Sequence, residues 1–263
     1  LELILHPMAE DAKEATGSMG DDTPLAVLSD RYRPLYHFFR QNFSQVTNPP
    51  IDSLRENKVM SLKTRFGNLG NILDFDTLTK ENIYVLNSPI LSNSQFNKFI
   101  NFFGKNSVNI DCSFSKDDSL ADTIIKIQKE AEIAVRQGAT QLILSDKELS
   151  ANKLPMPMLL CVGAINTYLI DKKLRGYVSI NVQSGEALDT HSFATLIGVG
   201  ATTVNPYLAF DSLYQRHSKK LFGQFSFDEC VERYIKSVNA GLLKIMSKMG
   251  ISVLSSYRGG CNF

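Results

Sequence analysis

The sequence has few of the residues that build metal sites and disulfide frameworks. It contains four cysteines in 263 residues, and no two of them are spaced as a CxxC pair. The four histidines are scattered and form neither an HxxH nor an HExxH pattern. We therefore expect no metal site, and we expect reduced thiols in a cytoplasmic protein.

Strong charge and long apolar runs are also missing. The net charge is +1, so no global field favours nucleic acid, a membrane surface or acidic substrates. The longest apolar stretch, Met156 to Ile170, is interrupted by Asn166 and Thr167 and is too short to span a bilayer. The hydrophobic content of 43% is ordinary for a globular protein and allows one large α/β domain or two small ones.

Residues 1–73 have the composition of an arm that packs on a larger body. Ser29-Asp30 can cap a helix that tolerates Pro34 in its first turn and presents Leu35 and Phe38 on one face. Consecutive prolines after Asn48 must end that helix. A second helix is predicted over residues 53–60.

Residues 74–226 alternate short apolar strands with helices. Strands are predicted at 83–86, 108–111, 142–144, 177–182 and 201–204, and helices at 92–103, 119–137, 157–175 and 188–198. This alternation predicts a parallel sheet, because parallel strands need crossover connections. About five βα repeats are too few for an eight-stranded barrel. The fold class is therefore α/β, an incomplete, TIM-barrel-like parallel βα domain with an N-terminal helical and loop arm, although an open doubly wound sheet fits as well.

Residues 227–263 form the third predicted segment. A long helix is predicted from Asp228 to about Gly250, and Ile251 to Leu254 is a possible strand that begins a further unit.

Polar residues follow the predicted strands, where ligands bind in parallel α/β folds. Asp111, Asp146 and Glu186 could act as acids, bases or magnesium ligands, but solvated or salt-bridged roles are the simpler interpretation. Cys112 and His191 could pair as nucleophile and base, although nothing in the sequence brings them together. Gly198-Val199-Gly200 ends a helix, so it is not a phosphate-binding loop.

Several long strings identify a family. Residues 17–56 (GSMGDDTPLAVLSDRYRPLYHFFRQNFSQVTNPPIDSLRE) closely resemble the start of the central domain of glutamate synthase large subunits. Further similar strings are GATQLILSD at 138–146, SGEA at 184–187, HSFATLIGVGATTVNPYLAF at 191–210 and GLLKIMSKMGIS at 241–252. They follow the family's order along nearly the whole chain.

The resemblance implies a role in making glutamate from 2-oxoglutarate and glutamine-derived ammonia. It implies two partner domains, an amidotransferase domain that releases ammonia and an FMN-binding barrel with an iron–sulfur cluster. The central domain would connect them and help to wall the ammonia channel, would hold no cofactor itself, and would be inactive alone. Ammonia must travel in such a channel because it would be protonated in bulk water.

The resemblance also suggests channel and interface residues. Thr23 is the first candidate and Ser113 a weaker one, and the loop acids Asp21 and Asp22 and the turn residue Asn48 complete the set. No catalytic, cofactor-binding or metal-binding residue is expected.

Three positions depart from the family pattern. Leu188 stands where the family commonly has Arg, Ser192 replaces a second His, and the last four residues differ from the usual continuation. These departures suggest the hypothesis that the chain comes from a split or decaying gene. Two other functions stay open: a stand-alone small-molecule-binding or catalytic α/β protein, and a regulatory subunit that docks on separate partner chains.

Overall fold

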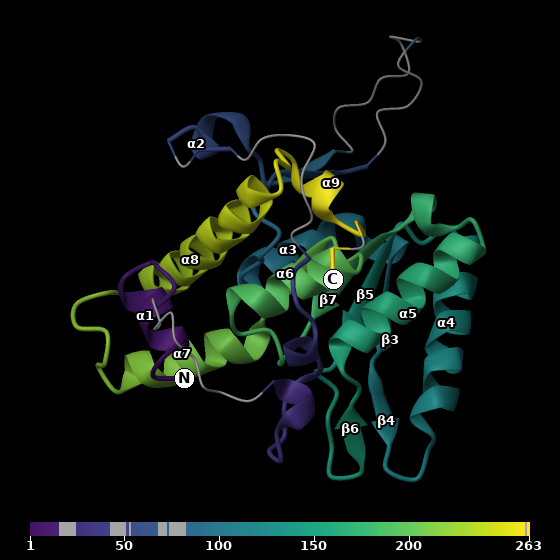
Figure 1. Cartoon of the computed structure of the whole chain (residues 1–263). Helices are drawn as coiled ribbons and strands as arrows, with labels where there is room; N and C mark the ends of the chain where they lie inside the picture. The colour runs from purple at the N-terminus through teal and green to yellow at the C-terminus, as the bar shows by residue number, and fades with distance from the viewer. Residues whose placement is uncertain (16–24, 43–50, 53, 68–72, 74–82, 261) are drawn as a thin grey trace.

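The computed structural model describes residues 1–15, 25–42, 51–52, 54–67, 73, 83–260 and 262–263. Its centre is a parallel sheet of four strands in the order β3-β5-β7-β8 (Figure 1). The strands are β3 (Ser107–Asp111), β5 (Gln141–Ser145), β7 (Ser179–Gln183) and β8 (Thr203–Asn205). The α/β fold and its parallel sheet are confirmed.

A short segment before the first crossover helix extends this sheet. Leu91 N donates to Val204 O at 3.0 Å, and Val204 N donates to Pro89 O at 2.8 Å, so residues 89–91 run parallel along the free edge of β8. The strand predicted at 83–86 forms, but it does not belong to the parallel sheet. Residues 84–86 form β2 (Tyr84–Leu86), which pairs antiparallel with β1 (Thr64–Phe66) in a separate two-stranded ribbon.

Crossover helices connect the strands largely as predicted. They are α3 (Asn93–Phe103), α4 (Leu120–Arg136), α5 (Met158–Asp171) and α6 (Thr190–Gly198). Ser92 begins α3 with a capping box, in which its hydroxyl accepts from Gln95 N and the Gln95 side chain accepts from Ser92 N. Gly138 follows α4 with φ +98°, a conformation that favours glycine. The predicted end of α5 at Gly176 was too late, because Lys173 already leaves the helix with φ +60°.

The two faces of the sheet are covered differently. Leu142 and Leu144 belong to the large hydrophobic core, whereas Ile143 points the other way and packs with Phe96 and Phe99 of α3. This follows from the two-residue period of a strand. Figure 1 shows α4 and α5 side by side over the large-core face. In the described part of the chain this sheet has four strands, too few for a closed eight-stranded barrel. The relation of the fold to such a barrel stays a prediction.

Helices from both ends of the chain pack together beside the sheet. They are α1 (Leu5–Glu10), α7 (Tyr207–Ser218) and α8 (Phe227–Lys248), and the short α9 (Leu254–Tyr257) follows the carboxyl end of α8 (Figure 1). The long predicted helix is α8, and α7 was not predicted. The strand predicted at 251–254 is wrong, because only Val253 makes a bridge, to Ser61, before α9 begins. Residues of all three predicted segments share one core, and the proposed boundaries at 73 and 226 stay predictions.

The N-terminal arm contains less helix than predicted. The residues after Pro34 form a single 3-10 turn, η2 (Leu35–Phe38), like η1 (Ala26–Leu28) before it. Ser29 does not cap a helix, since its hydroxyl accepts from Arg31 N and Arg33 Nε instead. The second predicted helix is the short α2 (Glu56–Val59). The 3-10 turns η5 (Gly104–Asn106) and η6 (Arg175–Tyr177) and the ribbon of β4 (Ser113–Ser115) with β6 (Lys153–Pro155) complete the described elements.

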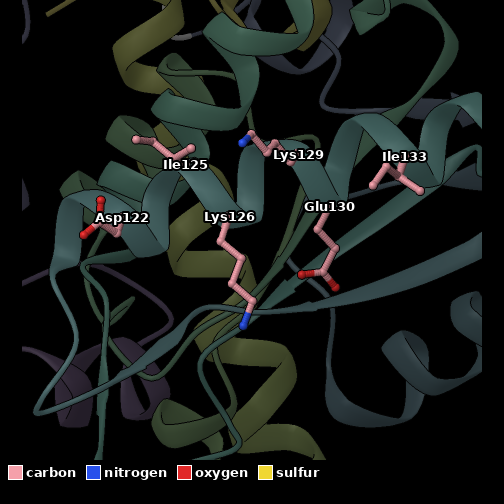
Figure 2. A pocket seen from close by; sticks show the side chains of 6 residues that line it. All are labelled: Asp122, Ile125, Lys126, Lys129, Glu130 and Ile133. Carbon is pink, nitrogen blue, oxygen red and sulfur yellow. The ribbon is translucent and has the colours of Figure 1, made fainter.

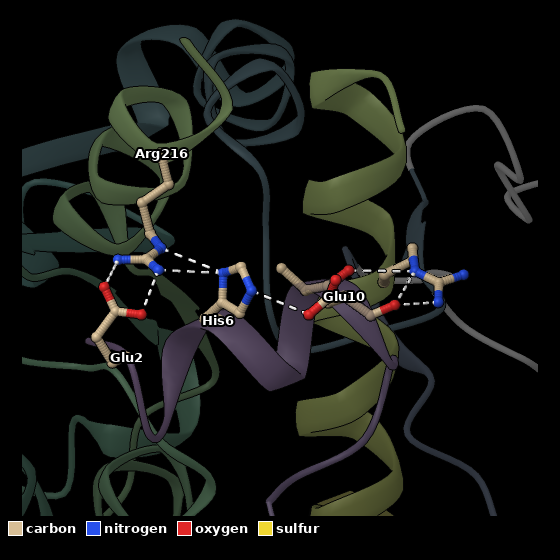
Figure 3. A network of polar contacts seen from close by, with 6 residues as sticks. Glu2, His6, Glu10 and Arg216 are labelled. Carbon is tan, nitrogen blue, oxygen red and sulfur yellow. Dashed lines mark hydrogen bonds and ion pairs between the residues drawn. The ribbon is translucent and has the colours of Figure 1, made fainter. Parts of the chain in front are cut away.

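A polar network fastens α1 to α7 and α8 (Figure 3). Arg216 forms two hydrogen bonds of 2.7 Å with the Glu2 carboxylate and also donates to His6 Nδ1. His6 Nε2 lies 2.9 Å from Glu10 Oε2, so one imidazole contacts both a cation and a carboxylate. Arg233 of α8 donates to the Glu10 carbonyl. In the part of the chain described, no helix is long and apolar enough to cross a membrane.

Candidate functional site

The best-defined polar site lies at the carboxyl ends of β5, β7 and β8. Asp146 follows β5, the segment Ser184-Gly185-Glu186 follows β7, and Tyr207 begins α7 just after β8. The parallel registers of these strands bring their ends to one edge of the sheet.

Asp146 is the buried centre of this site, with only 2% of its surface exposed. It accepts a hydrogen bond of 2.7 Å from Ser184 Oγ, and both of its carboxylate oxygens lie 3.1 Å from Gly185 N. Burial raises the pKa of Asp146, while the hydrogen bonds from Ser184 and Gly185 oppose that shift. Burial also raises the pKa of Tyr207, and the neighbouring Asp146 charge adds to the effect. The carboxylate is therefore used to hold the loop after β7.

Glu186 has a similar structural task. Its Oε2 atom accepts from Met158 N at 3.0 Å, at the first residue of α5. The residue before α5 is Pro157, whose side chain cannot cap the helix, so the Glu186 carboxylate takes that place. Burial raises the pKa of Glu186. Two strand-end acids thus bind backbone amides that would otherwise be unpaired.

The third strand-end acid, Asp111, ends β3 beside Ser145 of β5, at the same carboxyl edge of the sheet, and contacts Ser113. Ser113 donates to Asp111 Oδ1 from both its backbone nitrogen, at 3.0 Å, and its hydroxyl, at 2.7 Å. Lys153 Nζ lies 2.8 Å from Asp111 Oδ2 and connects β6 to the end of β3. Since the Ser113 hydroxyl proton is used in this way, its oxygen retains acceptor capacity. The simpler interpretation, salt-bridged or structural carboxylates, accounts for all three acids.

Two rows of mostly buried polar side chains cross the α3-facing side of the sheet. In the first row, Ser145 Oγ donates to Gln183 Oε1, and Gln183 Nε2 donates to Asn205 Oδ1. Asn205 then donates to Asn93 Oδ1 in the first turn of α3, at 2.9 Å.

The second row lies deeper in the sheet. Asn181 donates to Gln141 Oε1 at 3.0 Å and accepts from Thr203 Oγ1 at 2.7 Å. Sequence analysis missed both rows. The signal was present, because polar residues recur at every second position of β7 and β8 and stand at both ends of β5. Such satisfied networks fix the register and rigidity of a buried face.

Another cluster of titratable groups surrounds Tyr36 in the arm. His191 Nε2 lies 2.9 Å from the Tyr36 carbonyl oxygen, which joins the arm to the first turn of α6. Burial raises the pKa of Tyr36, and the Asp189 charge adds to this shift. Burial also lowers the pKa of His37, against the effect of Asp189. Asp189 itself accepts from Ser192 N and caps α6, so this cluster holds the arm against a helix start.

Cys112 and His191 do not contact each other. Hydrogen bonding to Cys161 and burial raise the pKa of the Cys112 thiol well above its usual range, which is the opposite of what a thiolate nucleophile needs. The prediction that Gly198-Val199-Gly200 ends a helix is confirmed. Gly198 is the last residue of α6, and Gly200 has φ +130°.

Of the five channel and interface candidates, only Ser113 lies in the described part of the chain. Thr23, Asp21, Asp22 and Asn48 lie outside the described residues. Among the residues described, no group of three or more His, Cys, Asp or Glu side chains could hold a metal ion.

A surface hollow of about 530 Å³ lies along α4 (Figure 2). Its lining is one exposed helix face, made by Asp122, Ile125, Lys126, Lys129, Glu130 and Ile133. Figure 2 shows these side chains arranged along a single helix. The hollow is therefore a helix surface and has no opposing wall.

Comparison with known proteins gives a consistent result. The sequence matches the family described as "Glutamate synthase central domain" over residues 1–263. It is 56% identical to the glutamate synthase [NADPH] large chain of Azospirillum brasilense, covering 100% of this chain and 18% of that protein. It is 44% identical to the corresponding Bacillus subtilis protein, covering 98% of this chain and 17% of that one.

More distant relatives follow the same pattern. The glutamate synthase [NADH] of Saccharomyces cerevisiae is 39% identical, with 97% of this chain and 12% of that protein covered. Among solved structures, a flavocytochrome b2 variant with benzoylformate aligns at a TM-score of 0.42 and 13% identity, covering 72% of this chain and 41% of that one. Since that TM-score is low, the fold assignment depends on the sheet itself.

Proposed function

The chain belongs to the glutamate synthase central domain family, and we propose that it acts as a connecting domain between an amidotransferase domain and an FMN-binding domain. It spans 18% of the length of the Azospirillum brasilense relative, so the remaining activities would reside in other parts of such a protein. In this proposal the chain is cytoplasmic, holds no cofactor and makes no glutamate alone. The parent enzyme would carry the FMN and the iron–sulfur cluster.

The use of the strand-end acids supports a non-catalytic role. Asp146 and Glu186 accept hydrogen bonds from backbone amides, and Asp111 contacts Lys153 and Ser113. A general acid or base needs a proton-transfer position that faces a substrate. These carboxylates are instead used to fix loops and a helix start, as a scaffold requires.

The same edge of the sheet fits a proposed wall for an ammonia path. Neutral ammonia travels best past hydroxyl and carbonyl acceptors that exclude bulk water. Ser113 is a described candidate because its oxygen can accept a hydrogen bond while its proton is donated to Asp111. Thr23, Asp21, Asp22 and Asn48 remain the proposed partners of Ser113 in this role.

A domain exchange tests the connecting role. This chain would replace the corresponding domain of the Azospirillum brasilense large chain, and glutamate formed from glutamine would be compared with free ammonia released. We expect glutamate formation with little leaked ammonia. A folded hybrid that hydrolyses glutamine but releases all of its ammonia to solution would contradict the proposal.

Two simpler experiments address the other functions. A purified chain that contained flavin would absorb near roughly 450 nm, and a stoichiometric chromophore would favour a stand-alone flavoprotein. The regulatory-subunit hypothesis requires binding to separate amidotransferase and flavin-domain polypeptides, and a pull-down without binding would count against it. No observation in the fold favours either function over the connecting role.

A further inference from the structure

A cavity of about 300 Å³ lies at the amino-terminal edge of the parallel sheet, away from the strand-end acids. Arg175 begins the turn that leads into β7, and Gly200 lies shortly before β8. The lining residues are Asn166, Ile170, Arg175, Gly200, Ser255, Arg258 and Gly259. Two of these residues are arginines, and none is acidic.

Arg175 is held in place by neutral acceptors only. Its Nε atom donates to Asn166 Oδ1 at 2.7 Å, its Nη1 atom to Val178 O at 2.6 Å, and its Nη2 atom to Gly200 O at 2.9 Å. A guanidinium has five N–H donors, so one donor on each terminal nitrogen is left over. The side chain is fixed in position, and its charge is not neutralised by these contacts.

Gly200 makes this arrangement possible. Its φ of +130° is a conformation that residues with a side chain rarely adopt, and a Cβ atom there would lie 2.5 Å from Asn166 Oδ1. The missing side chain leaves space for the Asn166 amide, which in turn orients Arg175.

Arg258 supplies the second positive charge. In the described part of the chain, its side chain forms no hydrogen bond or ion pair, although it is partly buried beside the cavity. Burial lowers the pKa of Arg258. Burial, and then the nearby charge of Arg258, lowers the pKa of Arg175 to about 10. Both groups remain charged at neutral pH, and partly buried like charges are unfavourable unless an anion accompanies them.

We propose that this cavity is an oxyanion-binding site that takes a doubly charged anion, phosphate or a dicarboxylate, between Arg175 and Arg258. Guanidinium groups bind such anions through paired, charge-assisted hydrogen bonds. Arg175 is already oriented, the Arg258 side chain donates to no acceptor among the described residues, and Ser255 lines the same cavity. The site is independent of the connecting role, since it lies at the other edge of the sheet from the proposed channel residue Ser113.

Binding to the 263-residue chain tests this site. Phosphate and succinate would be titrated calorimetrically in separate arms, with sodium chloride added to hold the ionic strength constant. We expect saturable binding of one anion per chain, weakened at least about tenfold in Arg258→Gln. The arm that binds more tightly identifies the anion class. The matched control is Arg65→Gln, at an exposed arginine of β1, which should bind like the wild-type chain.

Thermal melting provides the second readout. In chloride, Arg258→Gln should melt at the same temperature as the wild-type chain or higher, because the variant removes repulsion from Arg175. The saturating anion should raise the melting temperature of the wild-type chain and not that of the variant. The proposal is overturned if neither anion binds, if both proteins bind equally, or if the variant melts well below wild type in chloride. The last result would mean that Arg258 has a structural partner in the chain.

Discussion

Single residues in this molecule are often used for structure where their chemistry would also permit catalysis. Asp146 is the clearest example, because a carboxylate at a strand end in an α/β fold is a common catalytic position. Here its oxygens accept hydrogen bonds from the Ser184 hydroxyl and the Gly185 amide. Ser192, which the sequence analysis expected to depart from the family pattern, is another example. Its hydroxyl accepts from Asp189 N and completes the capping box of α6, so the serine has a local structural role.

Asp146 leads to a prediction about stability and pH. Its folded-state pKa is raised above the ordinary value of 3.8, so its contribution to stability is fully present below that value and is lost as the pH rises through the folded pKa. Asp146→Asn keeps acceptor geometry without the buried charge. We therefore expect the stability of the wild-type chain, relative to this variant, to fall as the pH rises above 3.8.

Urea unfolding at a series of pH values measures this difference. Asp146→Ala is the contrasting variant, since it leaves the Ser184 hydroxyl and the Gly185 amide without their acceptor. It should lose about 1–3 kcal/mol for each buried group left unpaired. A wild-type chain whose stability relative to Asp146→Asn rose with pH would refute the burial argument.

Two helical glycines differ in how closely other atoms approach them. Gly241 lies in α8 against α6, and a Cβ atom there would lie 2.5 Å from Cγ2 of the buried Thr190. Gly163 lies in the interior of α5 with no atom within 4 Å of its added Cβ. The two glycines have the same helical context but opposite steric surroundings.

Alanine substitution at these glycines should therefore have opposite effects. Gly163→Ala should stabilise the chain by about 0.5–1 kcal/mol because alanine loses less backbone entropy in a helix. Gly241→Ala should destabilise it by about 1–3 kcal/mol because the α6–α8 contact is overpacked. The free energy of unfolding of each variant measures this. Thr190→Ala combined with Gly241→Ala should recover part of the loss, and strictly additive effects would argue against the contact.

The whole molecule is connected through contacts between distant segments. Arg216 of α7 binds Glu2 and His6 near the start of the chain. At the other end, Asn42 N donates to Asn262 O at 2.7 Å, and Tyr257 OH donates to Gln41 Oε1 at 2.7 Å. Both ends of the chain thus contact the same core, as a connecting domain of fixed geometry would require.

Removing Arg216 should loosen the first of these contacts. Arg216→Ala deletes the donors to both Glu2 and His6, whereas Glu2→Gln keeps a side chain that can accept from Arg216. We expect amide hydrogen exchange in Met8–Asp11 to rise on the order of tenfold in Arg216→Ala and to change little in Glu2→Gln. Exchange that increased equally throughout the sheet would indicate global destabilisation and would contradict a local anchor.

The sequence by itself determined the crossover helices, the parallel strands and the family. Repeating apolar positions, the caps at Ser92 and Gly138, and long matching strings are local properties that need no knowledge of distant contacts. The sequence did not predict the hydrogen-bond partners of Asp146 and Glu186. It also did not predict that Ser113 contacts Asp111.

Only the tertiary structure decided which polar residues meet. The helix predicted after Pro34 is a 3-10 turn, and the residues of that turn pack on α6 through Tyr36 and His191. The rows of buried amides and the Arg175–Arg258 cavity depend on strand register and on contacts between residues far apart in the chain. Local propensity is weak compared with such packing and hydrogen bonding, which is why the sequence indicated the elements and the fold assigned their roles.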